Sequence, residues 1–169
     1  MKKLLVFALS FYLAVSSICF ANSKDTPVLI GLDFSELLMN KVDLAGGKIQ
    51  TIASYNRVIS IANSILQKTA LKVTDGATPV SGNVHDFYTI SSYAWPNPNT
   101  EDGMPWIYKD GYINEEAEGD NYDLKRYNTT IYYIKTLSLA WFYSGDEKYA
   151  SKAAELLRVW FINEETRMT

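Results

Sequence analysis

Two aromatic residues, Tyr93 and Trp95, stand in the proline-rich run SSYAWPNP of a segment that cannot be helical. Flat rings of this kind bind sugars by stacking on the C–H faces of the pyranose. The prolines at 96 and 98 stiffen the backbone, so that little entropy is lost when a ligand binds. Aromatic residues in a loop also serve as plugs that pin the loop to a core. The residue types favour a sugar-binding loop and a packed loop equally.

His85, the only histidine of the chain, opens this aromatic segment. Its imidazole could act as a general base, neutralise a charge, contact a substrate, or hydrogen-bond into the base of the loop. The only cysteine is Cys19. One histidine and one cysteine cannot form a histidine- or thiolate-rich metal site, so we expect no metal and no cofactor.

Six of the acidic residues that follow in the same region form a further candidate cluster. Paired carboxylates suit glycoside hydrolysis, but nothing in the sequence places two of these at a defined distance. The pattern also departs from the helix–loop–helix calcium motif. We therefore interpret them as solvated loop charges: Asp102, Asp110, Glu115, Glu116, Glu118 and Asp120.

Arg126 and Asn128 are further candidates for substrate contact, because they lie at the start of a predicted helix, directly after the loop. That helix spans residues 122–143 and carries an apolar stripe at helical spacing. The stripe consists of Leu124, Tyr127, Ile131, Ile134, Leu137 and Trp141.

The remaining elements are also helical. Periodicity predicts helices over residues 49–71 and 147–161, and Gly145 and Asp146 suit the end of one helix and the start of the next. So short a connection makes the last two helices antiparallel. Between residues 72 and 119 nothing is periodic, although the turn signal KDG suggests a small hairpin of residues 106–108 with 112–113. The predicted class is all-α with a long aromatic loop.

The amino terminus has the pattern of a secretory signal. A basic start is followed by an apolar run and by small residues before a cut after Ala21, which predicts a signal peptide at residues 1–21 and a lead segment at 22–48. Removal of Lys2 and Lys3 leaves 14 basic against 19 acidic residues, a formal charge of −5. We expect a periplasmic or secreted protein that binds neither nucleic acid nor, after signal removal, a membrane.

Several spaced motifs give a specific resemblance. Residues 85–87 (HDF), 93–98 (YAWPNP), 102–106 (DGMPW) and 110–116 (DGYINEE) resemble the His-Asp-Tyr, Tyr-x-Trp-Pro-Asp-Pro, Asp-Gly-x-Pro-Tyr and Asp-Gly-x-x-Asn-Pro-Glu motifs of the bacterial alginate lyase family. The helix pair from residue 144 onward is similar as well. The departures are Phe87 for tyrosine, Asn97 for aspartate and Glu115 for proline.

The resemblance implies an (α/α) toroid, of which residues 49–169 would be an incomplete, N-terminal part built of antiparallel helical hairpins. It implies β-elimination on alginate or a related uronate polymer. It also implies that the catalytic residues lie beyond Thr169, so that this chain alone is inactive. Only His85, Tyr93 and Trp95 are carried over, as substrate-side residues. Two alternatives stay open: a glycoside hydrolase on the same toroid, and a non-catalytic protein that binds acidic polysaccharide.

Overall fold

The computed structural model describes residue 27 and residues 29–169. The predicted signal peptide at residues 1–21 lies outside the described residues, as do residues 22–26 and 28 of the predicted lead segment. The chain divides into two compact units, one reaching Thr51 and one starting at Ile52. Each unit is described by itself.

The first unit contains helix α2, Phe34–Ala45, and the first residues of α3, Ile49–Leu66. Asp33 caps the start of α2, because its side chain accepts hydrogen bonds from the backbone N–H groups of residues 35 and 36. At the other end the N–H of Gly46 donates to the carbonyl of Val42 at 2.9 Å. None of the residues of α2 is buried.

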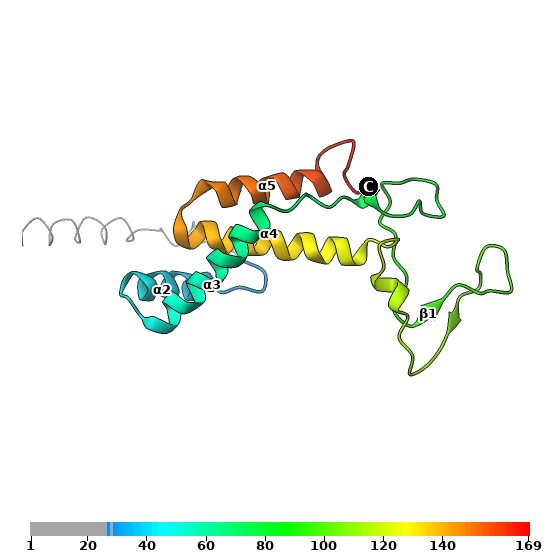
Figure 1. Ribbon diagram of the computed structural model, residues 1–169, viewed down its shortest axis with the longest axis horizontal. Helices are drawn as coiled ribbons and strands as arrows, with labels where there is room; N and C mark the ends of the chain where they lie inside the picture. The colour runs from blue at the N-terminus through cyan, green and yellow to red at the C-terminus, as the bar shows by residue number, and fades with distance from the viewer. Residues whose placement is uncertain (1–26, 28) are drawn as a thin grey trace, which may run out of the picture. The chain divides into compact units, whose positions relative to one another are not determined.

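The second unit is built on two antiparallel helices, α4 (Leu124–Ser144) and α5 (Glu147–Phe161), which lie side by side in Figure 1. Gly145 ends α4 in the left-handed conformation, with φ 72°, and donates to the carbonyl of Trp141 at 2.7 Å. Asp146 then caps α5 by accepting from the N–H of Lys148 at 3.2 Å. The predicted bounds of α5 and both predicted cap residues are confirmed.

The helical core of this unit joins α3 to the α4–α5 pair. Its buried residues are Ala62, Ile65, Leu137, Ala140, Tyr149, Ala153 and Leu156. The hydroxyl of Tyr149 also donates to the side-chain oxygen of Asn63 at 2.9 Å, which links α5 to α3 by a polar contact. The long predicted helix over 49–71 is shorter than expected, since α3 ends at Leu66.

The predicted apolar stripe of α4 is wrong in part. Ile131 and Trp141 are 37% and 43% exposed, whereas Thr130 and Thr136 are buried. The hydroxyls of both threonines form hydrogen bonds within the helix. Thr130 donates to the carbonyl of Arg126 at 2.9 Å, and Thr136 donates to the carbonyl of Tyr132 at 2.8 Å. A threonine bonded in this way can be buried without an unpaired polar group.

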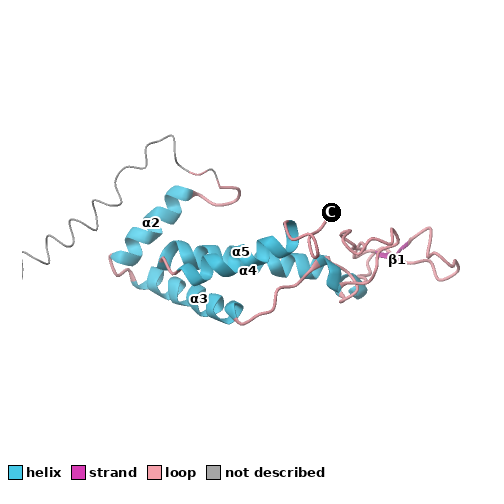
Figure 2. Cartoon of the chain, turned by 90° about the horizontal axis from the view of Figure 1, so that it is seen from above, coloured by secondary structure: helices cyan, strands magenta, loops and turns pink. Residues whose placement is uncertain are grey.

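The long segment between α3 and α4 holds four short elements: the 3₁₀ turns η1 (Val73–Asp75) and η2 (Glu115–Glu118), and the strands β1 (Ala94–Trp95) and β2 (Ile107–Tyr108). The strands pair antiparallel, with Ala94 opposite Tyr108. In Figure 2 this segment gathers beyond the end of the α4–α5 pair. The predicted hairpin of residues 106–108 with 112–113 is wrong, because β2 pairs with β1 instead.

Candidate functional site

The aromatic segment places Tyr93 and Trp95 at the small β1–β2 sheet. Tyr93 precedes β1 and is 59% exposed, whereas Trp95, within β1, is half-buried. The ammonium group of Lys109, directly after β2, lies 4.9 Å from the centroid of the Trp95 ring. Neither ring is deep among the helices, so both remain candidates for contact with a ligand.

Asn114 fixes the position of this sheet. Its side chain is 2% exposed, and it accepts from the N–H of Glu116 at 3.1 Å. Its amide nitrogen donates to the carbonyl of Ala94 at 2.7 Å, and its backbone N–H donates to the carbonyl of Ser92 at the same distance. The buried Asn114 side chain thus pairs with a backbone carbonyl of β1 and with a backbone N–H of η2, and these hydrogen bonds hold the loop in one conformation. Asn114 was not among the site residues predicted from the sequence.

The aromatic residues of the loop form two sets. One set is packed inside: Tyr88 and Trp106 lie against a small buried cluster of Ile90, Ala117 and Tyr122. The other set is exposed to solvent, and its members are Tyr93, Tyr108 and Tyr112, at 59%, 73% and 67%. Packing accounts for the first set, whereas the rings of the second set stay candidates for contact with a ligand.

Tyr122 belongs to the packed set. Its ring centroid is 5.1 Å from that of Tyr88. Burial raises the pKa of the Tyr122 phenol, and the neighbouring Tyr88 and the charge of Glu116 raise this pKa further. The Tyr122 hydroxyl therefore keeps its proton at neutral pH.

His85 connects the start of the loop to the end of the described chain. Its Nδ1 is 2.8 Å from the carbonyl oxygen of Arg167. A carbonyl only accepts, so Nδ1 carries the hydrogen, and in neutral His85 the lone pair is on Nε2. The backbone N–H of Thr169 donates to the carbonyl of His85 at 3.1 Å, and the Thr169 hydroxyl donates to Asp86 at 3.2 Å.

Phe87 holds the start of the loop in place by an apolar contact. Its ring meets Tyr127 of α4 edge-on at 5.7 Å, and Tyr127 meets the fully buried Trp160 of α5 edge-on at 5.6 Å. Phe87 needs no hydroxyl in this position, which gives a physical reason for a phenylalanine here. The loop start thus contacts α4 directly, and Tyr127 connects it to α5.

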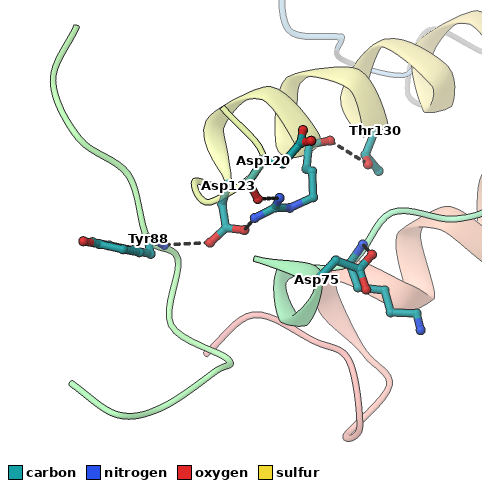
Figure 3. Close-up of polar contacts among 7 residues, drawn as sticks. Asp75, Tyr88, Asp120, Asp123 and Thr130 are labelled. Carbon is teal, nitrogen blue, oxygen red and sulfur yellow. Dashed lines mark hydrogen bonds and ion pairs between the residues drawn. The ribbon is translucent and has the colours of Figure 1, made fainter. Parts of the chain in front are cut away.

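Arg126 is 9% exposed and bonds to groups of the chain itself. Its guanidinium lies 2.6 Å from the Oδ1 of Asp123 and donates to the carbonyl of Asp120. The Oδ2 of Asp123 accepts from the N–H of Tyr88 at 2.8 Å, and the Asp123 N–H donates to the Tyr88 carbonyl at 2.7 Å. Figure 3 shows Asp123 between Tyr88 and the helix that carries Thr130. Through these contacts Arg126 helps to hold the loop against the start of α4.

Gly76 packs directly on the guanidinium of Arg126, because a Cβ at this residue would overlap with Nη2. The neighbouring Ala77 N–H donates to the carbonyl of Asn121 at 3.1 Å, which fastens the loop segment after η1 to the turn before α4. The other predicted residue of this helix, Asn128, is exposed on α4. The structure therefore separates Arg126, which is enclosed, from Asn128, which solvent reaches.

The six acidic residues named in the sequence analysis are all exposed: Asp102, Asp110, Glu115, Glu116, Glu118 and Asp120. Within residues 27 and 29–169, no group of three or more histidine, cysteine, aspartate or glutamate side chains is placed to hold a metal ion. In the same part of the chain, no helix is both long enough and apolar enough to cross a membrane.

Comparison with known proteins assigns the chain to a family. The family model described as alginate lyase matches residues 73–169, which is more than half of the chain. The chain belongs to the alginate lyase family. A solved structure, the crystal structure of an alginate lyase from Bacteroides ovatus, is 34% identical in sequence, with a TM-score of 0.69. No curated protein matches the chain.

The likeness to the Bacteroides ovatus alginate lyase covers 79% of this chain and 34% of that one, so the chain spans about a third of the length of the structure it matches. The resemblance drawn from the spaced motifs is confirmed, and so is the fold prediction of an all-α chain with the architecture of an incomplete (α/α) toroid. The matched residues include the aromatic loop and the α4–α5 pair.

Proposed function

We propose that this alginate lyase family chain is part of an exported polysaccharide lyase that cleaves alginate or a related uronate polymer by β-elimination. The observation that carries the proposal is the exposed aromatic surface, held in place by buried polar contacts, within the residues that the family model matches. The chain spans only a third of the solved lyase, so the activity of a whole enzyme is part of the proposal. Export rests on the signal-like pattern of residues 1–21.

The chemistry requires two things of the protein. The carboxylate of the uronate must be neutralised so that the C5 proton becomes acidic, and a base must then remove that proton while the bond at C4 breaks. In our proposal the rings of Tyr93 and Trp95 hold the sugar. The Nε2 of His85 and the amide of Asn128 contact its polar groups. Arg126 acts indirectly, by fixing the loop to α4, and the base is not assigned among the described residues.

The reaction class is tested by the products. The whole enzyme, of which we propose this chain to be a part, is incubated with a panel of uronate polymers and with neutral polysaccharides. Two quantities are followed: the ultraviolet absorbance of a new C4–C5 double bond, and the number of new reducing ends. A lyase raises both on uronates. New reducing ends without the double bond indicate a glycoside hydrolase, and binding without either indicates a sugar-binding protein.

The site is tested separately by affinity for an oligouronate. Removing an exposed ring that stacks on a sugar should cost about 1–1.5 kcal/mol, or about tenfold in affinity, so we expect that loss for Tyr93→Ala. Tyr132→Ala is the matched control, since Tyr132 is also exposed, at 51%, but lies on α4. Equal affinities of the Tyr93 variant and the wild-type chain would contradict the assignment.

A further inference from the structure

Lys109 lies beside Trp95, although it is not among the site residues predicted from the sequence. It directly follows β2, whose pairing with β1 sets Ile107 opposite Trp95. This register brings the side chain of Lys109 back over the Trp95 ring, with the ammonium 4.9 Å from the ring centroid. The two residues are fourteen positions apart in the sequence, so only the strand pairing brings them together.

The ammonium of Lys109 has no anionic partner among the described residues, although its loop is rich in carboxylates. Lys48, Lys148 and Lys152 each pair with an acidic side chain at 2.7–2.8 Å, whereas no such pair includes Lys109. Lys109 is exposed, and its ammonium group contacts the Trp95 ring. A cation that rests on an aromatic face at an exposed site is held weakly, so an anion can draw it away.

We propose that Trp95 and Lys109 form one subsite for an acidic sugar, in which the uronate ring replaces the ammonium on the face of Trp95 and the ammonium moves to the sugar carboxylate. This inference rests on the proposed function, because it names the residue that recognises the charge of the polymer. No bond is made or broken at the subsite. Lys109 is a binding residue that selects the substrate.

The exchange favours acidic sugars over neutral ones. A neutral sugar that stacks on Trp95 displaces the ammonium and has no anionic group that could pair with it. A uronate displaces the same group and supplies a carboxylate, with which a lysine forms a charge-assisted hydrogen bond. Exposed Tyr93 lies two residues before Trp95 and would extend the contact to a neighbouring sugar without adding charge.

The test measures affinities of the full chain by titration calorimetry, for an oligouronate and for a neutral oligosaccharide of equal length. We expect Lys109→Gln to weaken uronate binding about three- to tenfold and to leave neutral binding unchanged or tighter. Lys109→Arg should keep the preference for the uronate. Trp95→Ala should weaken both ligands. Lys135→Gln on α4 is the control that removes the same charge elsewhere, and circular dichroism checks that each variant is folded.

Two outcomes overturn the subsite: a Lys109→Gln variant that binds the uronate as tightly as the wild type, or one that loses affinity for both ligands to the same extent. A lyase assay separates this result from the proposed function. Uronate binding that depends on Lys109 supports the subsite, and if the whole enzyme then forms no C4–C5 double bond, the result contradicts the lyase. Absence of uronate binding by the wild-type chain overturns both.

Discussion

Replacing Gly76 with alanine tests the packing that fastens the loop to the start of α4. The φ of this residue is −86°, which alanine adopts freely, so the backbone does not oppose the change. The space does oppose it. The new Cβ would overlap with Nη2 of Arg126 and would lie 3.2 Å from Cζ of Arg126 and 3.3 Å from the carbonyl oxygen of Asn121. The guanidinium must therefore move away from Asp123.

The expected cost follows from three contributions. Forcing an extra carbon into a packed site costs about 1–3 kcal/mol. Alanine recovers about 0.4–1 kcal/mol by restricting the unfolded chain. Complete loss of one partner from a buried ion pair would cost about 3–5 kcal/mol, which is an upper limit here because a displaced Arg126 keeps part of its contact with Asp123. We expect Gly76→Ala to lower the free energy of unfolding by about 1–3 kcal/mol.

Urea unfolding followed by circular dichroism measures this difference. Gly46→Ala is the control: φ there is −76°, and a Cβ would meet backbone oxygens at 3.4 and 3.6 Å, which is ordinary contact. The cause is tested in an Arg126→Met background, where the cost of Gly76→Ala should shrink. The reasoning is refuted if Gly76→Ala unfolds at the wild-type urea concentration, or if its cost is the same with methionine at 126.

Two further predictions concern the helix pair. The side-chain hydrogen bond from Lys148 lowers the pKa of Asp146 below its ordinary 3.8, so its contribution to stability is complete above that pH and disappears as pH falls through the lowered value. Asp146→Asn keeps a cap and should flatten this dependence in urea unfolding between about pH 5 and 2; an unchanged slope would argue against it. Tyr149→Phe loses the hydrogen bond to Asn63 and should cost about 0.5–1.5 kcal/mol by the same assay, whereas wild-type stability would exclude a role for that bond.

Local signals predicted the helix pair well. Gly145 and Asp146 mark the connection because a left-handed backbone and a side-chain cap are requirements of single residues, which a sequence displays directly. The core face of α4 was less predictable. Thr130 and Thr136 read as polar in a sequence, and only the structure shows that each bonds within its own helix and is buried.

The loop was predictable as a loop, but its internal contacts were not. The turn signal after Tyr108 is real, since the N–H of Tyr112 donates to the carbonyl of Lys109 at 3.4 Å. Ala94, the strand partner of Tyr108, lies fourteen residues earlier, and this pairing leaves no periodic pattern in the sequence, so the sequence favours a hairpin with the nearest extended residues. Arg126 shows the same limit. Its position near the loop suggested a substrate contact, and its burial depends on Asp123 and on a glycine fifty residues away.

Asn114 divides the long segment between α3 and α4 into shorter closed loops. Because its side chain and backbone tie residues 92 and 94 to residue 114, the stretch between them is closed at its base independently of the rest. A second closure lies further out, where the N–H of Asn97 meets the carbonyl of Gly103 at 2.8 Å. Doubling a closed stretch costs only about 0.6 kcal/mol in chain entropy. Evolution or an engineer can therefore lengthen this outer tip, and so reshape what it reaches, while the anchored base keeps its geometry.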